Sequence, residues 1–152
     1  DFFIVLGVFA PDGKEVVFQG ALDPHTPVGQ GWLRASHRKL DAKLSTEYRP
    51  YHTHDEVQKL TPGKPVQLDV ELWPTSIVVP AGYRLGLSVR GKDYEWQKTS
   101  GARLSNFKNE LLGCGPFLHN DPRDRPAAVF SNRTTLHLDA NSYLLLPVIP
   151  PK

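Results

Sequence analysis

Methionine is absent from the 152 residues, and there is one cysteine, Cys114. A lone cysteine cannot form an internal disulfide, which excludes a small secreted fold built on disulfides. It leaves the compartment open, with a cytoplasmic location favoured. Because the chain opens with Asp1 directly inside an apolar, β-branched run, and not with methionine, we expect a piece of a longer polypeptide.

Long hydrophobic runs and a charge excess are also lacking. No segment is apolar over the roughly 18 residues that a membrane helix needs, and the N-terminus lacks the basic flank of a signal peptide. The net charge is +2, from 18 Lys and Arg against 16 Asp and Glu that are scattered along the chain. Nucleic-acid binders usually carry a basic stripe. We therefore expect neither a membrane nor a nucleic acid as partner.

Apolar and polar residues alternate with a period of two along much of the chain, which is typical of half-buried strands. The pattern is clearest at residues 66–72 (Val-Gln-Leu-Asp-Val-Glu-Leu) and 84–90 (Arg-Leu-Gly-Leu-Ser-Val-Arg). Turn sequences precede both segments, at residues 61–64 and 80–82.

About seven strands are predicted, and such a series of short strands is typical of a β-sandwich or barrel. They are residues 2–9, 15–18, 32–38, 66–72, 84–90, 134–138 and 143–149. Turns at 11–14 and 139–142 are expected to join the first and last pairs as hairpins. Two long connections, 39–64 and 92–125, suit the crossovers of a Greek key or jelly roll. The one helical candidate is 103–112.

No catalytic residue is predicted. The Gly-x-Ser-x-Gly elbow of α/β-hydrolases is absent, and the nearest string, at residues 86–91, has the wrong spacing within a predicted strand. Ser36 and His37 are neighbours, but on a strand they would point to opposite faces. His52 and His54 could share one face and grip a metal, which leaves a small metalloenzyme as a minor alternative. Because local spacing supplies no further ligand, no metal or other cofactor is predicted.

Tryptophan and arginine side chains supply the candidates for binding. The rings of Trp32, Trp73 and Trp96 could stack on sugars, although core or interface packing is favoured. Arg34 and Arg38 are expected on one strand face, where two guanidiniums repel unless each has an acceptor. The acceptors could belong to a partner surface or to carboxylates of the same domain. The Asp1 carboxylate is likewise either solvated or held by an arginine.

Five strings carry a family resemblance. They are residues 31–38 (Gly-Trp-Leu-Arg-Ala-Ser-His-Arg), 48–52 (Tyr-Arg-Pro-Tyr-His), 71–85, 119–126 (His-Asn-Asp-Pro-Arg-Asp-Arg-Pro) and 143–150. Together they resemble the C-terminal domain of the X-Pro dipeptidyl-peptidase and cocaine-esterase-like (CocE/NonD) serine hydrolases, from the first residue to the last. The resemblance implies an all-β, jelly-roll (galactose-binding-like) sandwich of two antiparallel sheets, joined to an α/β-hydrolase domain that carries the Ser-His-Asp machinery. It also implies strands that precede Asp1.

The predicted function is that of one non-catalytic domain, residues 1–152, of a longer serine hydrolase. The chain alone is expected not to be an enzyme, and the parent to be a dipeptidyl-peptidase or an acyl esterase or amidase. The domain would pack on the catalytic domain and shape access to its active site, and a homo-oligomer is also considered. The interface candidates are Arg34, His37, Arg38, Tyr51, His52 and Trp73, and the ligand-stacking candidates are Trp32 and Trp96. The alternative is a carbohydrate-binding jelly-roll module.

Overall fold

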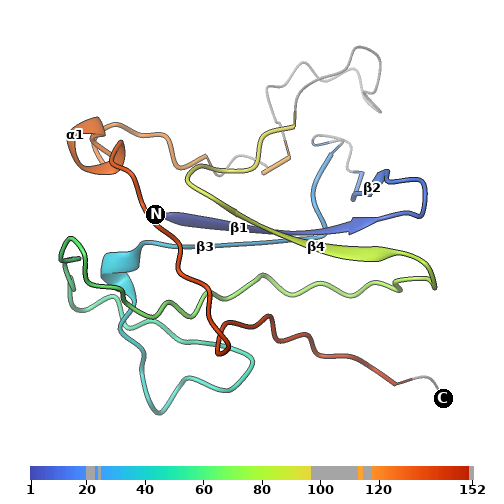
Figure 1. Ribbon diagram of the computed structural model, residues 1–152, viewed down its shortest axis with the longest axis horizontal. Helices are drawn as coiled ribbons and strands as arrows, with labels where there is room; N and C mark the ends of the chain where they lie inside the picture. The colour runs from blue at the N-terminus through green and yellow to red at the C-terminus, as the bar shows by residue number, and fades with distance from the viewer. Residues whose placement is uncertain (20–22, 24, 97–112, 115–117, 151–152) are drawn as a thin grey trace.

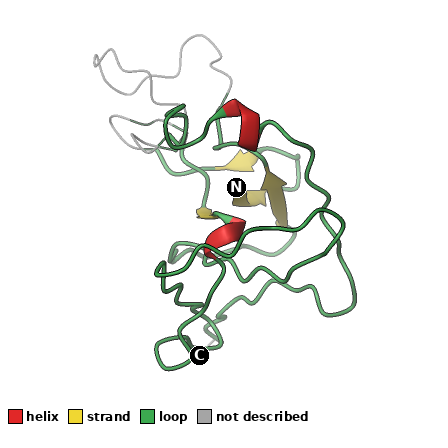
Figure 2. Ribbon diagram, turned by 90° about the vertical axis from the view of Figure 1, so that its left-hand side faces the viewer, coloured by secondary structure: helices red, strands yellow, loops and turns green. Residues whose placement is uncertain are grey.

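The computed structural model describes residues 1–19, 23, 25–96, 113–114 and 118–150. Its strands are β1 (Phe2–Phe9), β2 (Glu15–Val16), β3 (Gly29–Leu33) and β4 (Arg84–Arg90), and its short helices are the 3-10 helix η1 (Ala35–His37) and α1 (Ala127–Phe130). The strands form one antiparallel sheet, and most of the remaining described chain is extended or irregular (Figure 1, Figure 2). No helix within these ranges has the length and apolar character to cross a membrane.

β1 is the central strand, as its uninterrupted apolar sequence favours. β4 pairs with it along one edge, whereas β2 and β3 share the opposite edge. Phe3 and Val5 point to one face of the sheet and Leu6 and Val8 to the other, because side chains alternate along a strand. All four are buried, so the core lies on both sides of β1.

The first hairpin is confirmed. The Ala10 amide donates to the Lys14 carbonyl at 2.8 Å, and Gly13 takes a φ of 85° that glycine adopts without strain. The return strand is shorter than predicted: β2 covers Glu15–Val16, and Phe18 forms only an isolated bridge to Thr26. The strand predicted at residues 84–90 is confirmed with its bounds unchanged, as β4.

The strand predicted at residues 32–38 is wrong in its bounds. β3 ends at Leu33, and the chain then turns into η1, closed by the His37 amide donating to the Arg34 carbonyl at 2.7 Å. No residue of η1 is β-branched, so nothing local enforces an extended backbone there. Arg34 and Arg38 therefore do not share a strand face, and Ser36 and His37 lie on the 3-10 turn, not on opposite faces of a strand.

Three further predicted strands, at residues 66–72, 134–138 and 143–149, are not strands in the described chain. Their alternation encodes an extended backbone with one apolar side, but a strand also needs a neighbour to exchange backbone hydrogen bonds. The turn at 139–142 does form, with the Ser142 amide donating to the Asp139 carbonyl at 3.1 Å. The described strands thus build one sheet and not the two of a jelly roll, and the helix predicted at 103–112 lies outside the described residues.

Candidate functional site

An aromatic cluster lies where β3 meets the segment that follows residues 66–72. The rings of Trp32 and Trp73 pack edge to face, with centroids 4.8 Å apart and planes at 60°. The Trp73 amide donates to the Gln30 carbonyl at 2.8 Å, which fixes residue 73 beside β3. Both tryptophans remain partly exposed, at 38% and 50%. Their crossed planes give two separate edges and not the flat platform on which a sugar ring stacks, and exposed tryptophans are typical of protein interfaces.

His119 extends this cluster, and its orientation is set by a buried carboxylate. Its ring lies 4.8 Å from Trp32 and 5.3 Å from Phe3, between centroids. Asp93 is buried and accepts two hydrogen bonds from His119, from the amide and from Nδ1, each at 2.8 Å. In the neutral imidazole the proton then belongs on Nδ1, which leaves Nε2 as an acceptor. Sequence reasoning missed this pair, although the 119–126 string was among those that carried the resemblance.

Arg34, an interface candidate, is engaged within the domain. Its guanidinium donates to the Asp1 carboxylate at 2.9 Å and to both Asp124 oxygens at 2.9 and 2.7 Å. Arg125 approaches Asp1 from another side, with its Nε 2.9 Å from Oδ2. Asp1 is therefore held by two arginines. Of the two acceptor sources that the sequence left open, the structure shows the intradomain one for Arg34.

Arg38, a second interface candidate, also has its acceptors within the domain. Its Nη1 donates to the carbonyls of Ala35 and Gln58, at 3.0 and 2.6 Å. The Gln58 amide donates in turn to the Ser36 carbonyl at 2.7 Å. Arg38 thus links the loop after residue 52 to η1, and its guanidinium is hydrogen-bonded within the domain.

The histidine candidates meet at the far end of η1. His37 and His54 face each other with their Nδ1 atoms 3.1 Å apart, and the ring of His52 lies 6.1 Å from that of His54. His54 holds a φ of 54°, in the left-handed region. Within the described ranges, no group of three or more His, Cys, Asp or Glu side chains is placed to hold a metal ion.

His52 is less basic than an ordinary histidine. Burial lowers its pKa, and the nearby His54 adds to this effect, whereas the Asp69 carbonyl and the carboxylates of Asp69 and Glu71 act in the opposite direction. Its Nε2 is buried and finds no acceptor or donor among the described residues. Folded His52 therefore favours the neutral imidazole at its position near Asp69 and Glu71.

We expect the free energy of unfolding to fall as the pH drops below about 6.5, the pKa of an unperturbed histidine. The unfolded chain then binds a proton that folded His52 binds less readily, so acid favours unfolding. His52→Gln should lessen the decline between pH 6.5 and 5, measured by urea denaturation at each pH. His137→Gln is the control, and an equal decline in both variants would contradict the assignment.

Tyr51 and Trp96 lie apart from the tryptophan pair. Tyr51 is exposed, with the Arg49 guanidinium 5.8 Å from its ring centroid. Trp96 stacks on His25 at 4.6 Å between centroids, and His25 Nδ1 lies 3.1 Å from the Tyr94 hydroxyl, which donates to the Glu15 carboxylate. Burial and the neighbouring Glu15 carboxylate raise the pKa of Tyr94. Trp96 thus belongs to an internal aromatic stack, and the structure does not bring it together with Trp32.

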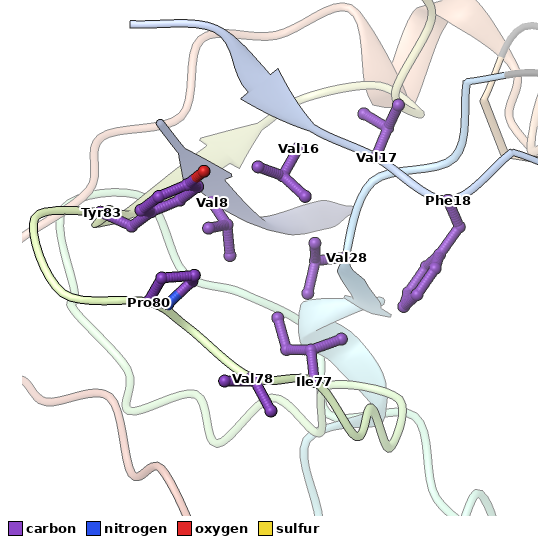
Figure 3. A pocket seen from close by; sticks show the side chains of 9 residues that line it. All are labelled: Val8, Val16, Val17, Phe18, Val28, Ile77, Val78, Pro80 and Tyr83. Atoms are coloured by element: carbon purple, nitrogen blue, oxygen red, sulfur yellow. The ribbon is translucent and has the colours of Figure 1, made fainter. Parts of the chain in front are cut away.

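A largely apolar pocket of about 280 Å³ opens on the other side of the sheet. Side chains from β1, β2 and residues 77–83 face one another across it (Figure 3). They are Val8, Val16, Val17, Phe18, Val28, Ile77, Val78, Pro80 and Tyr83. Phe18 and Val78 at the rim are exposed, so apolar surface continues beyond the pocket. With no charged residue in its lining, the pocket suits apolar contact and not chemistry.

Comparison with known proteins shows the family to which the chain belongs. The model of the X-Pro dipeptidyl-peptidase C-terminal non-catalytic domain matches residues 1–143. Two crystal structures of SACOL2612, a CocE/NonD family hydrolase from Staphylococcus aureus, each align with 67% of this chain at 30% identity and a TM-score of 0.60. The alignment covers 19% of the hydrolase chain, so the present chain spans about a fifth of that relative. None of the curated proteins matches the chain.

Proposed function

Because the chain belongs to the family of X-Pro dipeptidyl-peptidase C-terminal non-catalytic domains, we propose that it packs on the α/β-hydrolase domain of a longer serine hydrolase and shapes access to that enzyme's active site. The observation that carries the proposal is the match over residues 1–143 to a domain described as non-catalytic. The small share of the S. aureus hydrolase that aligns with the chain supports a parent of greater length. In that parent the domain would complete the jelly-roll sandwich that the resemblance implies.

Two surfaces support a packing role. Tryptophan is enriched at protein interfaces relative to the rest of the surface, and Trp32 and Trp73 both have substantial exposed area. The apolar rim around the pocket of Figure 3 adds a second region of the same character. Large exposed apolar patches are typical of protein contacts. Of the interface candidates, Trp73 and Tyr51 keep large exposed areas, whereas the guanidiniums of Arg34 and Arg38 bond within the domain itself.

We expect the isolated chain to show no turnover of p-nitrophenyl esters or Xaa-Pro p-nitroanilides. A chimera in which it replaces the aligned part of the S. aureus hydrolase should regain hydrolysis, because the chimera supplies a catalytic domain for it to cover. In the chimera, Trp73→Ala should raise KM more than it lowers kcat, because weaker packing of the domain on the catalytic domain alters substrate access and not the catalytic groups.

The matched control is the same hydrolase with the aligned part deleted, which should aggregate or lose turnover. If the deleted enzyme hydrolyses the substrates as well as the chimera does, the proposed role fails. Turnover by the isolated chain that survives repeated purification and is titrated by a serine-directed phosphonate would also contradict it.

A further inference from the structure

Two histidine side chains meet between η1 and the loop at residues 52–58. Nδ1 of His37 lies 3.1 Å from Nδ1 of His54, which is a hydrogen-bonding distance. One nitrogen must donate its proton and the other must accept it, so the bond forms when the pair is neutral or holds one extra proton. A second extra proton would make both nitrogens donors. The bond would then be lost, and two cations would face each other.

The loop that carries His54 is held at both ends and strained between them. The Thr53 amide donates to the Lys39 carbonyl at 3.1 Å, and the Gln58 amide donates to the Ser36 carbonyl at 2.7 Å. His54, between these two bonds, has a φ of 54°, in the left-handed region that a side chain makes unfavourable. Such a conformation persists only where surrounding contacts fix it. Losing the histidine contact would therefore favour release of the loop.

The charged side chains near the histidine pair are already engaged with one another or with the backbone. Arg34 and Arg38 flank η1, and their guanidiniums bond to carboxylates and to carbonyls of the domain, respectively. Lys39 lies 3.1 Å from Asp55 and 3.3 Å from Glu56, so it compensates these two carboxylates of the loop. Among the described residues, a second charge on the histidine pair thus gains little compensation.

His52 is the third imidazole of this cluster. Its ring lies 6.1 Å from that of His54. Burial lowers the pKa of His52, which outweighs the opposing effect of Asp69 and Glu71. His52 therefore resists taking a charge, and the pair of His37 and His54 is the part of the cluster whose protonation changes a contact.

We propose that the contact between His37 and His54 is a pH-sensitive latch, which holds the loop at residues 52–58 on η1 and releases it when both rings are charged. The open loop takes the second extra proton without the repulsion between two adjacent cations, so the closed loop binds fewer protons and acid favours release. Histidine is the side chain that changes charge between about pH 5 and 8, which places the transition in that range. Because the latch lies within this domain, it does not depend on the proposed function.

Hydrogen exchange of two backbone amides measures the latch. The amides of Thr53 and Gln58 are followed by NMR in the 152-residue chain from about pH 8 to 5, with each rate corrected for the intrinsic effect of pH. We expect their protection factors to fall about tenfold, the factor that repulsion between two unit charges at this distance gives in water. The Thr26 amide, which donates to the Phe18 carbonyl at 3.0 Å, reports on the remaining fold, and its protection should fall less.

His54→Asn removes the titration and keeps the backbone. Asparagine tolerates the left-handed region and can bond to the His37 ring without gaining a charge. Protection at Thr53 and Gln58 should then be independent of pH, whereas the matched variant His52→Gln should keep the loss of protection. A loss that persists in His54→Asn, or that His52→Gln abolishes, would overturn the latch.

The unmodified chain gives a second test that no folding defect of a variant can obscure. At about pH 8, imidazole nitrogen shifts should show Nδ1–H on one of His37 and His54 and Nε2–H on the other, because one ring donates and the other accepts. Nε2–H on both rings would mean that no hydrogen bond joins them, which contradicts the proposal.

Discussion

Arg125→Ala should lower the free energy of unfolding by about 3 kcal/mol, the scale for breaking a largely buried ion pair. The Nε of Arg125 lies 2.9 Å from Oδ2 of Asp1. The two side chains are only 15% and 7% exposed, respectively. The Arg125 Nη1 also donates to the His119 carbonyl at 2.6 Å, and its Nη2 to the Gly91 carbonyl at 3.1 Å. Truncation therefore removes one of the two cations around Asp1 and leaves two carbonyls short of a donor.

The chain offers a matched control two residues away. Arg123 pairs with Asp121 at 2.7 Å, but its side chain is 90% exposed, so Arg123→Ala should leave the free energy of unfolding nearly unchanged. Urea denaturation followed by far-UV circular dichroism measures both variants. Arg125→Lys keeps the charge without the forked donors and should recover only part of the loss. Equal effects for Arg125→Ala and Arg123→Ala would show that burial of the Asp1 pair contributes nothing.

Gly31→Ala should destabilise the fold by about 3 kcal/mol, at the upper end for overpacking a close contact. A Cβ on Gly31 would overlap the Glu71 carbonyl oxygen and lie within 3.2 Å of the Leu72 Cα. These are backbone atoms, which cannot rotate away as a side chain can. The segment at 71–73 would have to move, which breaks the bond from the Trp73 amide to the Gln30 carbonyl.

Gly29→Ala is the control on the same strand. Its Cβ would meet the Leu6 Cβ at 3.4 Å, an ordinary contact, so the change in stability should stay within about 1 kcal/mol. Denaturation by circular dichroism gives the free energy of unfolding. Tryptophan emission reports separately on the Trp32–Trp73 contact, which only Gly31→Ala should alter. A Gly31→Ala chain as stable as Gly29→Ala would mean that residues 71–73 do not lie against β3.

The strands β1 and β4 were predictable from the sequence because their apolar patterns are local features of the chain. The apolar run at Phe2–Phe9 and the alternation at Arg84–Arg90 each specify an extended backbone, and the Pro-Asp-Gly turn specifies the hairpin. The strand predicted over residues 32–38 was wrong in its bounds, since β3 ends at Leu33. A short alternation of apolar and polar residues does not determine where the chain leaves the sheet. The alternation at 66–72 is as regular as that of β4, yet it forms no described strand.

The candidate site divides in the same way. Trp32 and Trp73 were identified from residue type. Their contact arises because the chain at Trp73, about 40 residues further along, lies beside β3. Arg34 was correctly singled out as needing an acceptor, and only the fold showed that Asp1 and Asp124 provide it. Asp93 and His119 were not predicted as a pair, because 26 residues separate them and nothing in their spacing signals contact.

The sequence by itself determined the mostly β character, the first hairpin, the absence of a hydrolase elbow and the family to which the chain belongs. These are properties of residue type and short-range order, which backbone preferences and turn chemistry encode directly. Only the tertiary structure decided which extended segments pair and which carboxylates neutralise the arginines. Pairing joins residues that are distant along the chain, so the partner available in space decides it and the local pattern does not.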